Sequence, residues 1–184
     1  GLILVNINPA YRAHELEYAL NRVACRAVVL PRRFKTSHYL DILAELAPEL
    51  ATSGPGQLHA ARLPEPREVI LLDDMPAPGT RSWQQLAALG NASALAHLHE
   101  AERALGFDDP VNIQFTSGTT GAPKGATLTH HNIVHKGWFI GEAMRLTEHD
   151  RLCIPVPFYH CFGMVLGNLA CVTHGACMVI PGEG

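Results

Sequence analysis

The sequence predicts an α/β protein in which a mostly parallel sheet is flanked by helices on both faces. Short apolar runs rich in β-forming residues recur along the chain and are typical of buried strands. Between them lie segments whose apolar residues have the three- and four-residue spacing of an amphipathic helix. Strands that alternate with helices in this way favour a parallel sheet covered on both sides.

Composition and charge agree with a globular domain or part of one. The chain has 184 residues, of which 47% are hydrophobic and 17% are charged. A formal net charge of -3 without a basic stripe gives no reason to expect a nucleic-acid partner. No apolar run reaches the roughly 18 residues that a membrane-spanning helix needs. The five cysteines form no C-x-x-C pair, and we expect reduced, mostly buried thiols in a cytoplasmic or organelle-matrix protein.

In the first half of the chain, strands are expected at 2–7, 27–30 and 69–72. Two helices are expected between them, the second capped by Ser37. The apolar faces of these helices are formed by Leu16, Ala19, Leu20 and Val23, and by Tyr39, Ile42, Leu43 and Leu46. Residues 52–66 contain three prolines and two glycines and predict an exposed loop.

Beyond this loop, Ser82 to Gln85 fits a capping box that opens a short helix. The next helix, 92–105, should turn Leu95, Leu98 and Ala101 inward and stop at Gly106. A later helix should begin at Asn132 as its cap and run to about Met144. The remaining segments are expected to be strands at 111–115, 125–129, 152–156 and 177–180, and a helix at 164–172.

The stretch from Thr116 to Gly125 predicts a polyphosphate-binding loop. It holds four hydroxyl side chains, three glycines, one proline and one lysine. Glycines let backbone N–H groups approach a ligand, and Lys124 adds a compact positive charge. The P-loop template G-x-x-x-x-G-K-[ST] does not fit, because Pro123 replaces its second glycine and Gly125 replaces its final hydroxyl residue. A Gly- and Thr-rich surface turn is the alternative reading.

These residues resemble a known family. Phe115-Thr-Ser-Gly-Thr-Thr-Gly-Ala-Pro-Lys-Gly125 looks like the phosphate-binding signature of the acyl-adenylate-forming (AMP-binding) superfamily. Pro157-Phe-Tyr-His-Cys-Phe-Gly-Met164 resembles the aromatic-histidine motif beside the acyl pocket of that superfamily, and the run 8–20 looks like its fatty-acyl-CoA synthetase branch. The resemblance covers nearly the whole chain.

The resemblance implies a two-step reaction. The carboxylate of a medium- or long-chain fatty acid attacks the α-phosphate of ATP to give acyl-AMP and pyrophosphate, and the thiol of coenzyme A then displaces AMP. The resemblance implies that His160 lies beside the substrate carboxylate and the α-phosphate, and that Lys124 binds the β- and γ-phosphates. The implied nucleotide-binding residues are Thr116, Ser117, Gly118, Thr119, Thr120, Gly121 and Lys124. The implied acyl-pocket residues are Phe158, Tyr159, His160, Phe162, Gly163 and Met164.

Parts of the family's apparatus have no match in these residues. We find no counterpart of the glutamate that holds Mg²⁺, of the aspartate that binds ribose, or of the lysine of the C-terminal domain. We therefore expect 1–184 to be a fragment of the large N-terminal domain, cut at both ends and inactive alone. We divide it into a first α/β portion, 1–110, and a portion with the phosphate loop and acyl pocket, 111–184. We expect the isolated segment to expose apolar surface and therefore to self-associate. A homo-oligomer is a separate expectation for the protein.

Other functions stay open at this point. The resemblance also fits an aryl-CoA ligase, a luciferase-like oxidase, an amino-acid adenylation domain, or a non-catalytic nucleotide-binding protein of the same fold. His130, His131 and His135 suggest a metal site, but the zincin pattern needs a glutamate where Asn132 stands, so no metal ligand is assigned. Asp73 and Asp74 are interpreted as a solvated turn.

Overall fold

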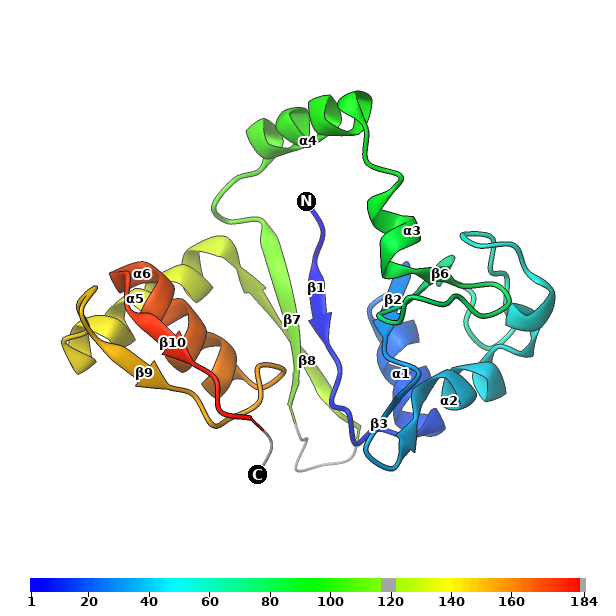
Figure 1. Cartoon of the computed structure of the whole chain (residues 1–184), viewed down its shortest axis with the longest axis horizontal. Coiled ribbons are helices and arrows are strands. Elements are labelled where there is room, and N and C mark those ends of the chain that lie inside the picture. The colour runs from blue at the N-terminus through cyan, green and yellow to red at the C-terminus, as the bar shows by residue number, and fades with distance from the viewer. Residues whose placement is uncertain (117–121, 183–184) are drawn as a thin grey trace. The chain divides into compact units, whose positions relative to one another are not determined.

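The computed structural model of the chain describes residues 1–116 and 122–182 (Figure 1). These residues form two compact units, one made of Gly1–Asn8 with Ala101–Gly184 and the other of Pro9–Glu100. Helices and strands alternate in both, which confirms the α/β class. The described strands pair into four small sheets, and four of their six pairings are parallel.

The unit Pro9–Glu100 is built on a three-stranded parallel sheet in the order β2-β5-β6. Its strands are β2 (Ala27–Leu30), β5 (Glu68–Leu71) and β6 (Arg81–Ser82), and a hairpin of β3 (Arg33–Phe34) and β4 (Ser37–His38) follows β2. The helices are α1 (Ala13–Arg22), α2 (Tyr39–Leu46), the 3₁₀ turn η1 (Pro48–Thr52), α3 (Trp83–Ala87) and the start of α4 (Ala92–Ala104). Both helices predicted before residue 50 and the strands near 27 and 69 are therefore confirmed.

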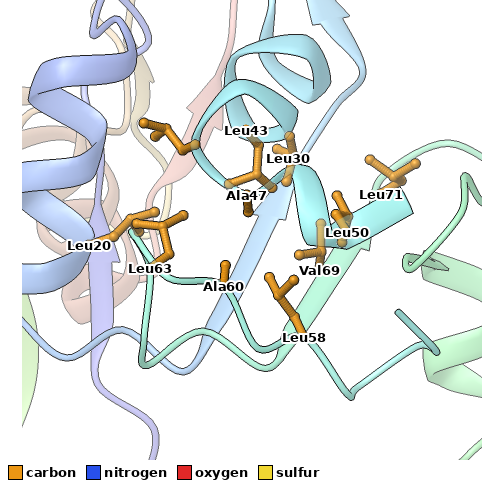
Figure 2. Close-up of a cluster of buried hydrophobic side chains, with 11 residues drawn as sticks. Leu20, Leu30, Leu43, Ala47, Leu50, Leu58, Ala60, Leu63, Val69 and Leu71 are labelled. Carbon is orange, nitrogen blue, oxygen red and sulfur yellow. The ribbon is translucent and has the colours of Figure 1, made fainter. Parts of the chain in front are cut away.

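A single apolar cluster holds this unit together (Figure 2). Leu20 of α1, Leu43 of α2, and Leu30 and Val69 of the sheet are almost fully buried. The segment 52–66, which we predicted to be exposed, contributes to the same cluster through Leu58, Ala60 and Leu63. The prediction was wrong because prolines and glycines exclude a helix or strand, whereas burial depends on where the apolar side chains point.

Two predicted helix caps were wrong and one is confirmed. Ser37 lies in β4, where its hydroxyl accepts a hydrogen bond from Arg12 Nη1 at 2.8 Å, and α2 begins at Tyr39 without a side-chain cap. Thr129, rather than Asn132, caps helix α5 (His130–Met144), because its Oγ1 accepts from the Asn132 N–H at 3.2 Å. The Ser82–Gln85 capping box forms as predicted.

Helix α4 has the predicted extent but not the predicted burial. None of its residues is buried, and Leu95 and Leu98 are more than half exposed. It ends at Ala104, two residues before Gly106. The apolar stripe that we read as inward is thus uncovered within the described part of the chain.

The other unit is organised by the sheet β1-β7-β8 (Figure 1). Strand β1 (Leu4–Asn6) pairs in parallel with β7 (Pro110–Thr116), which pairs antiparallel with β8 (Lys124–Thr129). A second, parallel pair joins β9 (Arg151–Cys153) to β10 (Cys177–Val179). Helix α5 packs against α6 (Ala170–His174) and against the π-helical stretch η2 (Phe162–Leu169).

The segment 152–180 differs in two details from its prediction. Strand β9 ends at Cys153 rather than Val156: the N–H of Ile154 still donates to Val179, but Pro155 has no N–H to continue the ladder. The predicted helix 164–172 begins as a π-helix at Phe162 and becomes α-helical at Ala170. Within the described residues no helix is long and apolar enough to span a membrane.

All five cysteines are free, but only Cys171 is buried. The expectation of mostly buried thiols was therefore wrong for the exposed Cys153, Cys161 and Cys177. Burial raises the pKa of the Cys171 thiol, and the neighbouring Cys177 raises it further.

The buried loop supplies a stability prediction. In the complete protein, Leu58→Ala should destabilise the unit Pro9–Glu100 by about 2–5 kcal/mol, because Leu58 is fully buried and its loss leaves a cavity. Hydrogen exchange of the β2 and β5 amides measures this. Leu72→Ala is the control, since Leu72 is 52% exposed. Equal protection in the two variants would contradict a core that includes the loop.

Candidate functional site

The predicted phosphate loop connects the two strands of a β-hairpin. Thr116 at the end of β7 is the register partner of Lys124 at the start of β8. The hydroxyl of Thr116 donates to the carbonyl oxygen of Lys124 at 3.4 Å. Both residues are exposed, and Lys124 forms no ion pair within 1–116 and 122–182. The structure therefore brings a hydroxyl and a cation together at the base of the loop.

The tip of the loop lies outside the described residues. This concerns Ser117, Gly118, Thr119, Thr120 and Gly121, whose assignment to the nucleotide stays a prediction. On the described side, Gly125 faces Phe115 across the hairpin, and an added Cβ would lie 3.2 Å from Ile113 Cγ2. The hairpin thus needs a small residue directly after Lys124.

His160 lies in a tight turn between β9 and η2. Its backbone N–H donates to the carbonyl of Pro157 at 3.2 Å, and its own carbonyl accepts from the N–H of Met164 at 3.0 Å. The turn is therefore closed by backbone hydrogen bonds on both sides of the histidine, which limits the positions that the imidazole can take.

The imidazole of His160 has a defined tautomer. Its Nδ1 lies 3.2 Å from the N–H of Phe162, and a backbone N–H can only donate, so Nδ1 must accept. The Cys161 thiol lies 3.8 Å from the same Nδ1. The proton of the neutral ring consequently sits on Nε2, which leaves an N–H donor on an exposed side chain.

The aromatic residues of the motif are exposed, whereas Gly163 is buried and Met164 is partly buried. Phe158, Tyr159 and Phe162 are 36–48% exposed. Gly163 is buried against the backbone of residues 156 and 157: an added Cβ would overlap the Pro157 carbonyl oxygen and lie 2.9 Å from that of Val156. Gly163 is thus required for close packing of η2, and its assignment to the acyl pocket stays a prediction.

Met164 accepts hydrogen bonds from two residues that belong to neither of the predicted motifs. The side-chain amides of Asn6 and Gln114 donate to its Sδ at 3.5 Å and 3.7 Å. Gln114 is only 9% exposed, and Asn112, two positions earlier, is 2% exposed. The signal in the sequence was the alternation of amides with apolar residues along 111–115, which we read only as a strand.

These residues suit a polyphosphate better than a metal ion. Lys124 and Thr116 offer charge and hydroxyl donors without carboxylates that would repel an anion. Among residues 1–116 and 122–182, no group of three or more histidine, cysteine, aspartate or glutamate side chains is arranged to hold a metal. His131 instead contacts the rings of Phe107 and His135, and its Nδ1 lies 3.7 Å from Asp108.

An α/β fold, a Gly- and Thr-rich sequence between two strands of a hairpin, and a histidine turn before η2 together indicate the adenylate-forming class. Comparison with family models agrees: the model of AMP-binding enzymes matches residues 1–184. The chain therefore belongs to the AMP-binding enzyme family.

Individual relatives are similar along the whole chain. The chain is 45% identical over 188 residues to the mitochondrial medium-chain acyl-CoA ligase ACSF2 of Danio rerio, and 46% identical over 185 residues to that of Mus musculus. These matches cover 100% and 98% of the chain. The chain spans 30% of the length of both relatives.

Solved structures show the same fold. ATP-bound MatB of Rhodopseudomonas palustris is 26% identical, with a TM-score of 0.65 over 98% of this chain and 30% of its own. Apo MbtA of Mycobacterium smegmatis is 24% identical, with a TM-score of 0.74 over 97% of this chain and 29% of its own. The second likeness concerns the fold alone.

The packing at Gly163 can be tested directly. Gly163→Ala should destabilise the complete protein by about 1–3 kcal/mol, because the methyl group forces η2 away from residues 156 and 157. Chemical denaturation measures the change. Gly182→Ala is the control, since nothing lies within 4 Å of its added Cβ. A Gly163→Ala variant as stable as the control would show that η2 does not pack as described.

Proposed function

We propose that the complete protein is an ATP-dependent acyl-CoA synthetase that activates a medium-chain fatty acid as acyl-AMP and transfers it to coenzyme A. The observation that carries the proposal is 45–46% identity over the whole chain to medium-chain acyl-CoA ligases. The two motifs of the candidate site lie within that match. Because those relatives are named mitochondrial, an organelle matrix is a candidate location alongside the cytoplasm.

In this proposal Lys124 binds the β- and γ-phosphates of ATP. Its charge has no competing carboxylate among the described residues, and its backbone is fixed by pairing with Thr116. A preformed cation stabilises charge that develops on phosphate oxygens as pyrophosphate departs. Thr116 adds a hydroxyl donor at the same end of the hairpin.

His160 orients the fatty-acid carboxylate. Because Nδ1 accepts from the Phe162 N–H, the imidazole presents Nε2–H as a donor to a carboxylate or α-phosphate oxygen. The ring needs no positive charge for this role. Phe158, Tyr159 and Phe162 are apolar neighbours that can contact the acyl chain.

The family implies Mg²⁺ with ATP, and its usual contribution is to neutralise phosphate charge. The described residues do not offer a ligand set for it, so we assign no metal ligand to this chain. We also propose that the complete protein can form a homo-oligomer.

The proposed reaction is tested by assaying the complete protein with ATP, Mg²⁺, coenzyme A and acids of graded chain length. We expect AMP and acyl-CoA to form, with a maximum of kcat/KM among medium-chain acids. Thioester formation only with aryl or amino acids would overturn the proposed substrate class. No acid-dependent pyrophosphate release at all would overturn the enzymatic function.

Lys124→Ala should lower acid-dependent ATP–pyrophosphate exchange by about 10²-fold or more, a typical loss for one electrostatic group. Lys136→Ala is a matched control, because Lys136 is an exposed lysine on α5 outside the hairpin. Exchange at the wild-type rate in the Lys124 variant would remove this residue from the mechanism.

His160→Ala should slow acyl-AMP formation more than thioester formation from supplied acyl-AMP, because its N–H donor acts on the carboxylate before the adenylate exists. Both half-reactions can be measured in single turnovers. His149→Ala, at a side chain 87% exposed, controls for loss of a surface histidine. An equal loss in both half-reactions would favour a purely structural histidine.

A further inference from the structure

Strand β7 buries its polar face. Asn112 and Gln114 are 2% and 9% exposed, whereas Val111, Ile113 and Phe115, on the opposite face, are only partly buried. Buried amides must find partners, because an unpaired one loses its hydrogen bonds to water. Asn112 donates to the carbonyl of Leu4 at 2.9 Å, within the sheet. Gln114 donates out of the sheet, to a residue of η2.

Asn6 and Gln114 act as a pair. They are register partners on the parallel strands β1 and β7, so their side chains emerge next to each other on one face. Both amide groups donate to the same atom, Met164 Sδ, at 3.5 Å and 3.7 Å. We name Asn6, Gln114 and Met164 the sulfur clamp.

The sulfur clamp joins the two halves of the candidate site. On one side, Gln114 lies two residues before Thr116, at the base of the phosphate loop. On the other side, the N–H of Met164 donates to the carbonyl of His160 at 3.0 Å. A displacement of η2 on the sheet would therefore carry His160 with it, while the base of the phosphate loop stays with β7.

At its two buried glycines, η2 is held by close packing rather than by side-chain hydrogen bonds. Gly163 and Gly167 lie against Pro157 and Ile154, where an added Cβ would overlap the Pro157 carbonyl or lie 2.8 Å from Ile154 Cγ2. Packing contacts of this kind have no preferred direction and permit small sliding movements. Two directed hydrogen bonds to one sulfur favour a single position along the strands.

We propose that Asn6 and Gln114 are positioning residues that act through Met164 to set the place of His160 relative to Thr116 and Lys124, at the base of the phosphate loop. This inference rests on the proposed function, because the sulfur clamp can change a reaction rate only if the protein forms acyl-AMP. A misplacement of the order of 1 Å costs about 10²-fold in rate when reacting groups are no longer aligned. The clamp should affect the rate of adenylation without contributing to ATP binding.

The test compares Gln114→Leu with Asn112→Leu in the complete protein. Both variants replace a buried amide on the same face of β7, but only Gln114 contacts Met164. We expect Gln114→Leu to lower kcat for acyl-AMP formation at least tenfold with an unchanged KM for ATP. Asn112→Leu should lower the thermal midpoint but leave kcat within about twofold, as expected for a local stability effect.

Met164→Leu supplies a second variant of similar volume that removes only the acceptor. Met164→Leu should lower kcat as much as Gln114→Leu does. The double variant should have a kcat close to that of either single variant, because the two residues belong to one interaction. Additive losses, or an equal kcat in the Gln114 and Asn112 variants, would overturn the clamp.

A readout independent of activity separates this inference from the proposed function. Hydrogen exchange of the Met164 amide, which is bonded to His160, should be at least tenfold faster in Gln114→Leu than in Asn112→Leu. If the wild type activates no fatty acid, the proposed function fails and this comparison alone decides the clamp. Equal exchange in both variants would overturn it.

Discussion

The parallel pairing of β1 with β7 is the contact on which the described site depends. Its backbone register pairs Leu4 with Asn112, 108 positions apart, so the segment of chain between the two strands contains all of Pro9–Glu100. Closing so long a loop is costly in entropy, although the cost grows only slowly with length. Once closed, β7 serves three purposes: it pairs with β8 to form the hairpin, carries the base of the phosphate loop, and presents the amide that binds Met164.

Local patterns in the sequence predicted most of the elements. The strand 27–30, the helix near 14–23 and the Ser82 capping box depend on neighbours within a few residues, so periodicity and cap chemistry suffice. Burial without periodicity could not be predicted in this way. Leu58 and Leu63 stand among prolines and glycines, and only the tertiary structure directs them into the core. Helix α4 shows the opposite error. The periodicity of its apolar residues predicts an apolar face, but it does not show whether another element covers that face.

Those site residues that stand in short contiguous motifs could be predicted from the sequence. Lys124 and His160 stand in compact motifs, so their residue types indicate a function without a structure. Asn6 and Gln114 could not be found in this way, because their partnership depends on a strand register that no short segment contains. Alternation along 111–115 shows that the strand has two different faces. It does not show that the amide face is the buried one, since the partners of these amides, Leu4 and Met164, lie far away in the sequence.

The helix that carries Met164, η2, is π-helical over Phe162–Leu169. A π-helix is rare and locally unfavourable, and it persists where surrounding contacts hold it, often at functional sites. Here Gly163 and Gly167 pack against Pro157 and Ile154, while Met164 accepts hydrogen bonds from β1 and β7. Neither contact alone determines the position of the helix, because close packing allows sliding and two weak sulfur hydrogen bonds allow rotation. In the proposed role of the sulfur clamp, the two kinds of contact act together on the turn that carries His160, and both depend on residues outside 162–169.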